Sequence, residues 1–136
     1  MLDLNSFEKA CEALKLALEL YDKSALAPDS AERVLLRDGV IQRFEFTFEL
    51  SWKMIRRYLD IYGLEKADSL NNKDLFRVGR EQGLIEAPER WFHFLKMRNQ
   101  TTHVYDKEKA AEVFSAAREF LPDCLYLLGR LKEKAG

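Results

Sequence analysis

The sequence predicts an all-α protein, an antiparallel up-and-down bundle of about five helices forming one domain over residues 1–136. Its 21 Leu and 13 Ala outnumber the 12 Val, Ile and Thr combined, with 6 Gly and 3 Pro. This composition favours helix over strand. Apolar residues recur at steps of three and four, and the breaks between periodic segments are short, as between antiparallel helices. A hydrophobic fraction of 47% can fill one core.

The first expected helix covers residues 4–25. One apolar stripe runs along it at steps of four and three: Phe7, Cys11, Leu14, Leu18 and Tyr21. Pro28 stops this helix, and Asp29 with Glu32 three residues later is a candidate capping pair for the next one.

The second expected helix covers residues 30–62 and ends at Gly63, a residue type favoured at C′. One apolar face carries Ile41, Phe44, Phe48, Ile55, Leu59 and Tyr62. A second face carries Phe46, Leu50 and Met54. A helix that is apolar on most sides is expected at the centre. At roughly 45–50 Å it is longer than so small a domain needs, so a second copy of the chain is the simplest cover and a homodimer is expected.

Residues 63–70 are expected to connect to a short third helix, which Asn71 or Asn72 caps and which ends near Gly83. Pro88 suits the first turn of a fourth helix, which fades in the polar run 98–103. Asp106 caps the last helix. Its expected inward residues are Ala110, Val113, Phe114, Ala117, Leu121, Leu125 and Leu128.

Charge and composition exclude several function classes. The formal net charge is −1, so any contact with nucleic acid must come from a local patch. No apolar run approaches the ~18 residues of a membrane span. The N-terminus lacks the basic start and apolar run of a signal peptide, and two cysteines cannot build a disulfide framework, so we expect a cytoplasmic protein. Two histidines and two separated cysteines offer no metal-site spacing, and no Gly-rich loop indicates a nucleotide cofactor.

The polar run at the end of the fourth helix suits phosphoryl transfer without a metal. His103 can move a proton near neutral pH, and Arg98 can hold a phosphate in a fixed fork. Asn99, Thr101 and Thr102 can hydrogen-bond phosphate or ribose oxygens. Arg98 and His103 lie about 140° apart on an ideal helix, so the helix must end between them or a second chain must contribute. The spacing alone favours a structural alternative, in which His103 bonds a backbone carbonyl and Arg98 a surface carboxylate.

Other polar residues fit structural roles. Glu45 and Glu49 are expected in ion pairs with one of three cations: Arg43, Lys53 or Arg98. His93 is expected to be packed and hydrogen-bonded between two phenylalanines. A solvated face is favoured over an RNA-facing patch for the cluster Lys53, Arg56 and Arg57.

Two segments resemble a known family. Residues 98–105, RNQTTHVY, resemble the Arg-x4-His-x-Tyr signature of the HEPN superfamily, and residues 37–53, RDGVIQRFEFTFELSWK, resemble its branch of nucleotidyltransferase substrate-binding proteins. This resemblance implies a homodimeric helical bundle that works beside a small nucleotidyltransferase. It also implies the toxin of a toxin–antitoxin pair, a metal-independent endoribonuclease whose dimer interface joins the Arg and His of both chains.

The resemblance also assigns roles by position. Arg98 would bind and polarise the phosphate, and His103 would be the general acid or base. Tyr105 would be modified with AMP by the partner nucleotidyltransferase, which silences the nuclease. Two other expectations stay open: a non-catalytic nucleotide- or substrate-binding subunit of that nucleotidyltransferase, and a purely structural dimerisation module.

Overall fold

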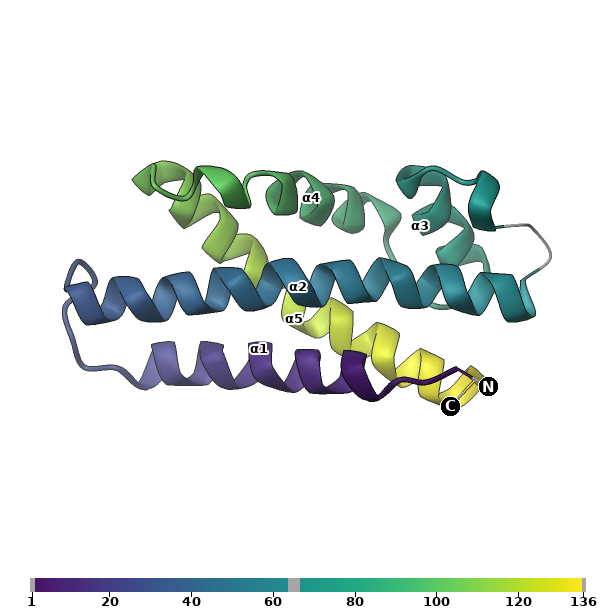
Figure 1. The fold of residues 1–136 in the computed structure, drawn as a ribbon, viewed down its shortest axis with the longest axis horizontal. Coiled ribbons are helices and arrows are strands. Elements are labelled where there is room, and N and C mark those ends of the chain that lie inside the picture. The colour runs from purple at the N-terminus through teal and green to yellow at the C-terminus, as the bar shows by residue number, and fades with distance from the viewer. Residues whose placement is uncertain (1, 64–66, 136) are drawn as a thin grey trace.

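Helix α2 is the longest element and lies between the other helices (Figure 1). The computed structural model describes residues 2–63 and 67–135. The elements are α1 (Asn5–Lys23), α2 (Ala31–Tyr62), the 3-10 turn η1 (Ala67–Ser69), α3 (Asn72–Glu81), α4 (Pro88–Asn99), the 3-10 turn η2 (Thr101–His103) and α5 (Lys107–Ala135). In Figure 1, α1 follows one side of α2, α3 and α4 lie on the other, and α5 runs diagonally across the bundle. The predicted all-α class with five helices is confirmed.

The start of α2 is capped by a different residue from the one predicted. The hydroxyl of Ser30 accepts a hydrogen bond from the backbone N–H of Arg33 at 3.1 Å. Ser30 directly precedes the first helical residue, so its side chain reaches the third N–H of the helix, as an N-cap must. The capping pair predicted from Asp29 and Glu32 is therefore wrong by one position.

The other predicted helix starts are confirmed. The Asn71 side chain accepts from the backbone N–H of Asp74 at 2.8 Å and so caps α3. Pro88 occupies the first turn of α4, where its missing N–H costs nothing. The carboxylate of Asp106 accepts from the backbone N–H of Glu108 at 2.8 Å at the start of α5.

Two glycines end helices for different reasons. Gly63 follows α2 in an extended conformation, with φ −80°, and not in the left-handed conformation typical of a C′ glycine. A Cβ here would lie 2.6 Å from the carbonyl oxygen of Leu59, so close approach is what favours glycine. Gly83, two residues after α3, does adopt a positive φ of 75°. The predicted connection over 63–70 falls partly on residues 64–66, which lie outside the described residues.

An aromatic cluster joins α2, α4 and α5 in the core. The ring of Phe120 is fully buried and lies with its centroid 5.1–5.8 Å from four other rings. Those rings belong to Phe44, Phe48, Trp91 and Phe94. All four rings are edge-on to Phe120, an arrangement that aromatic pairs prefer. The cluster fixes α4 against α2, and this contact positions the site described below.

Between Ala117 and Leu128, which are buried as predicted, the buried face of α5 departs from the predicted one. The prediction continued in steps of four through Leu121 and Leu125, whereas the buried residues are Phe120 and Cys124. Leu125 is 38% exposed. A helix has 3.6 residues per turn, so repeated steps of four drift around the axis by about 40° each. Alternating steps of three and four keep the observed residues facing the core.

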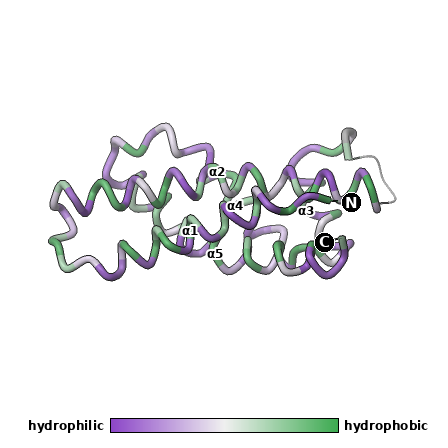
Figure 2. Tube along the Cα trace, turned by 60° about the horizontal axis from the view of Figure 1, so that its bottom comes forward, coloured by the Kyte–Doolittle hydropathy of each residue, from purple (hydrophilic) through white to green (hydrophobic). Residues whose placement is uncertain are grey.

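Several large apolar side chains stay exposed on α1 and the first half of α2. Leu16, Leu20, Leu35 and Phe46 are each at least 50% exposed. A groove of about 350 Å³ runs beside the three leucines. Met54, predicted on the same apolar face as Phe46, is buried. Figure 2 shows hydrophobic and hydrophilic segments alternating along each helix. None of the helices described is long and apolar enough to cross a membrane.

Candidate active site at the end of helix α4

Helix α4 ends at Asn99, and a short 3-10 turn follows. The backbone N–H of Gln100 bonds the carbonyl of Met97 at 3.0 Å, and the N–H of His103 bonds the carbonyl of Gln100 at 2.9 Å. These bonds to the third preceding residue tighten the chain where amide and β-branched residues weaken the α-helix. Of the two predicted possibilities, the end of the helix between Arg98 and His103 is therefore present.

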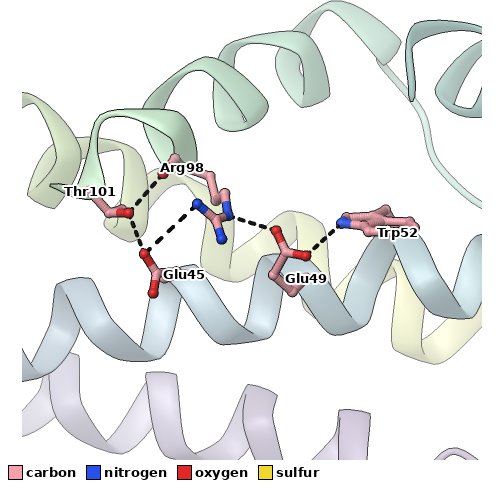
Figure 3. A network of polar contacts seen from close by, with 5 residues as sticks. All are labelled: Glu45, Glu49, Trp52, Arg98 and Thr101. Carbon is pink, nitrogen blue, oxygen red and sulfur yellow. Dashed lines mark hydrogen bonds and ion pairs between the residues drawn. The ribbon is translucent and has the colours of Figure 1, made fainter. Parts of the chain in front are cut away.

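The guanidinium of Arg98 is held by two carboxylates of α2. Its Nε donates to Glu49 Oε1 at 2.6 Å, and its Nη1 lies 4.0 Å from Glu45 Oε2 (Figure 3). All three side chains are 29–37% exposed. Charge-assisted bonds of this kind are shorter and stronger than neutral ones. The predicted ion pairing of both glutamates is confirmed, with Arg98 as the partner.

Thr101 ties the turn to the same carboxylates. Its hydroxyl lies within hydrogen-bond distance of the Glu45 carboxylate and, at 2.8 Å, of the Arg98 carbonyl. The hydroxyl has one proton, which it can give to either acceptor. Thr101 is buried, so its hydroxyl stabilises the turn and does not face solvent. The prediction that Thr101 binds phosphate together with Thr102 is therefore not supported.

Trp52 holds the far side of Glu49. Its indole N–H donates to Glu49 Oε2 at 3.2 Å, while the other oxygen of Glu49 binds Arg98. The contacts of Trp52 and Thr101 in this network were not predicted from the sequence. The spacing of 45, 49 and 52 on α2 carried a signal, because residues three and four apart share one helix face.

The remaining predicted site residues lie at the surface. Asn99, Thr102 and His103 are exposed, and Tyr105 is 84% exposed. The rings of His103 and Tyr105 have their centroids 6.1 Å apart at an angle of 75°. The structure thus brings His103 beside Tyr105 and Arg98 beside the glutamates. Within the described residues, no hydrogen bond or ion pair joins Arg98 to His103.

His93 does not have the packed environment predicted for it. The buried face of α4 consists of Trp91, Phe94 and Met97, which follow one another at steps of three. His93 falls outside that face and is exposed. Across the described ranges, no group of three or more His, Cys, Asp and Glu side chains is arranged to hold a metal ion.

The two cysteines lie in the core and are not reactive groups. Cys11 and Cys124 are free thiols, both fully buried. The pKa of the Cys124 thiol is raised above its ordinary value. The larger cause is its hydrogen bond with Cys11, and the second is its burial. A thiol that stays protonated is a poor nucleophile and a poor metal ligand.

The fold and this site together define the class of the protein. It is a small all-α protein of HEPN type, in which a carboxylate-held arginine precedes an exposed turn bearing histidine and tyrosine. The chain belongs to the family described as "Nucleotidyltransferase substrate binding protein like", and the match covers residues 2–133.

The chain is also similar to a named protein and to two solved structures. The chain is 33% identical to a Haemophilus influenzae protein named "Probable ribonuclease HepT", across 98% of this chain and 94% of that protein. A solved Haemophilus influenzae structure, described as the fold of a substrate binding domain of a nucleotidyltransferase, superimposes with TM-score 0.84 at 32% identity, covering 96% and 99% of the two chains. A Thermus thermophilus structure matches with TM-score 0.71 at 31% identity, covering 90% and 98%.

Proposed function

We propose that this chain is a metal-independent endoribonuclease, acting as a homodimer and as the toxin of a toxin–antitoxin pair. The observation that carries the proposal is the fixed guanidinium of Arg98 beside the exposed turn with His103. An arginine whose orientation is set before substrate arrives can stabilise charge that develops on a phosphate without further reorganisation. The relative named "Probable ribonuclease HepT" supports the same activity.

In the proposed reaction the 2′-hydroxyl of RNA attacks the neighbouring phosphorus, and the bond to the 5′-oxygen breaks. His103 of one copy takes the proton from the 2′-hydroxyl, and His103 of the second copy gives a proton to the leaving oxygen. Arg98 binds the phosphate and stabilises its extra negative charge. Asn99 and Thr102, exposed at the same helix end, hydrogen-bond ribose or phosphate oxygens. The products are a cyclic phosphate and a free 5′-hydroxyl.

The exposed apolar side chains support the homodimer. Leu16, Leu20, Leu35 and Phe46 form a surface that a second copy would remove from water. Light scattering is expected to give about twice the chain mass of 15.9 kDa. A monomer at all concentrations would contradict a site shared between two copies.

Tyr105 supports regulation by a partner nucleotidyltransferase. Its side chain is 84% exposed and its ring lies 6.1 Å from that of His103. Addition of AMP to the Tyr105 hydroxyl would put bulk and negative charge where RNA phosphates bind. Mass spectrometry after co-expression with the nucleotidyltransferase is expected to show an AMP-sized gain at Tyr105, absent from Tyr105→Phe. Full neutralisation of Tyr105→Phe by the partner would contradict modification and favour occlusion.

The decisive experiment compares the two histidines. Purified wild type is expected to cleave RNA in EDTA and to arrest growth when expressed, and His103→Ala is expected to lower cleavage by about 10²–10⁴-fold. His93→Ala is the matched control, because His93 is the other histidine of the chain and is exposed on α4. Equal cleavage by wild type and His103→Ala would show that the activity is not that of this site.

A second function is favoured by the description of the Haemophilus influenzae structure as a substrate binding domain of a nucleotidyltransferase. In that case the chain would be a non-catalytic subunit that binds a nucleotide or another substrate for its partner. Saturable nucleotide binding without growth arrest, with no RNA cleavage by the purified dimer, would favour this function over the nuclease.

A further inference from the structure

Two cations lie against the ring of Trp52 on α2. The Nζ of Lys53 is 5.8 Å and the Cζ of Arg56 is 5.2 Å from the ring centroid. Both distances are within the range of cation–π attraction. Across residues 2–63 and 67–135, no carboxylate forms an ion pair with Lys53 or Arg56. Among the residues that the structure describes, these charges are therefore not neutralised, and an anionic ligand can bind them without displacing an acid from that part of the chain.

A rigid connection joins these cations to Arg98. Glu49 binds Arg98 Nε at 2.6 Å through one oxygen and the indole N–H of Trp52 at 3.2 Å through the other. Along the axis of α2, Lys53 lies about 6 Å and Arg56 about 10.5 Å beyond Glu49. The separation of the cations from the Arg98 site is thus set by one helix and one bridging carboxylate.

We propose that Lys53 and Arg56 form a second phosphate site, which binds the phosphodiester next to the one at Arg98 in single-stranded RNA. This inference rests on the proposed nuclease function and extends it. A single free phosphate needs one cationic site, whereas a strand presents further phosphates at a spacing of several ångströms. Lys53 and Arg56 both lie on the same side of the Arg98 site along the axis of α2. This linear order of cations matches the linear order of phosphates in an RNA strand.

The Trp52 ring gives these cations a defined position. Long basic side chains lose rotamer entropy when they bind an anion, and contact with a ring before binding reduces that loss. The Nε of Arg56 is buried without a hydrogen-bond partner among the described residues. The contact with the Trp52 ring, and not a hydrogen bond at Nε, therefore holds the guanidinium in position. For a chain with net charge −1, such a local site is the form that RNA binding must take.

The test separates binding along the strand from the chemical step. Lys53→Gln and the double variant with Arg56→Gln are compared with Lys9→Gln, an equal charge change on α1, on the other side of α2 from α4 (Figure 1). Two probes are used: a mixed-sequence dinucleotide with one phosphodiester and a mixed-sequence eight-nucleotide RNA. We expect Lys53→Gln to raise KM for the longer RNA and to leave cleavage of the dinucleotide within about twofold of wild type.

A binding measurement gives a second readout. In the His103→Ala background, which leaves the RNA intact, Lys53→Gln is expected to lower the slope of log affinity against log salt by about one. Trp52→Leu is expected to weaken binding of the longer RNA, and Trp52→Phe, which keeps a ring, to restore most of it. Circular dichroism establishes that each variant is folded.

The outcomes distinguish this site from the nuclease function itself. If Lys53→Gln matches Lys9→Gln in KM and salt slope while Arg98→Ala abolishes cleavage, the second phosphate site is refuted and the nuclease stands. If wild type neither cleaves nor binds the eight-nucleotide RNA, the proposed function fails and this inference fails with it. Weaker capture of a co-expressed nucleotidyltransferase, with unchanged RNA affinity, would assign the cations to a protein interface and overturn the proposal.

Discussion

The aromatic core and the Arg98 network use consecutive residues of the same helix. On α2, Phe44 and Phe48 are fully buried against Phe120, while the next residue in each case, Glu45 or Glu49, points to Arg98. One residue turns a helix by about 100°. Two Phe-Glu steps, one turn apart, therefore build the core and the site together. Core packing on one face of α2 therefore fixes the positions of the two glutamates on the next face.

The aromatic core and the Arg98 network are stabilised by different interactions. The core consists of rings that need only close packing, and a well-packed interior tolerates little loss of volume. The network consists of charges that are 29–37% exposed and need defined partners. Substitutions should therefore separate the regions: loss of volume in the core lowers stability, whereas loss of a polar atom in the network alters both stability and cleavage.

The largest effect on stability is expected from Phe120→Ala. Its ring lies against four others from α2 and α4, so truncation removes buried area and leaves a cavity. The free energy of unfolding should fall by about 3–5 kcal/mol, measured by urea denaturation with circular dichroism. Leu125→Ala, on the same helix but 38% exposed, is the control, with an expected loss below about 1 kcal/mol. Equal losses for the two variants would remove the distinction between the two faces of α5.

A smaller, two-part effect is expected from Thr101→Val. The substitution keeps the shape of the side chain but removes the hydroxyl that lies between Glu45 and the Arg98 carbonyl. Its loss should cost about 1–3 kcal/mol, because a polar group in a partly buried network is left without a partner. Cleavage should fall as well, since Glu45 then holds Arg98 less firmly. Thr101→Ser keeps the hydroxyl and should retain most of both. A loss of stability with unchanged cleavage would show that the turn and the site are independent.

The sequence was sufficient for the periodic parts of the molecule. The five helices, the central place of α2 and the caps at Asn71 and Asp106 follow from apolar spacing and local hydrogen bonding. The inward residues of α5 between Ala117 and Leu128 did not, because small angular errors accumulate over repeated steps of four. The residues of the candidate site were proposed from the motif. The contact between Arg98 and Glu49, however, joins positions 49 residues apart, and only tertiary packing determines such a contact.

The smallest effect is expected at the ion pair between Arg118 and Asp22, which is more exposed to solvent than the Arg98–Glu49 pair. Arg118 bonds both oxygens of Asp22, at 2.9 and 2.8 Å, and joins α5 to α1. The hydrogen bond with Arg118 lowers the pKa of Asp22 below its ordinary value of 3.8. The carboxylate is 52% exposed, so solvent screening limits its contribution to about 0.2–1 kcal/mol.

The sign of the pH dependence follows from the lowered pKa of Asp22. A carboxyl group whose pKa is lower in the folded protein stabilises the fold above its unfolded pKa, and this contribution is lost as the pH falls through the folded value. Asp22→Asn should therefore be slightly less stable than wild type at pH 7, and the difference should shrink below pH 3.8 and in 1 M salt. Urea midpoints at pH 7 and at successively lower pH measure this. A difference that grows as the pH falls would contradict the pair, and one that persists in 1 M salt would show that packing of the Asp22 side chain, not its charge, connects α1 to α5.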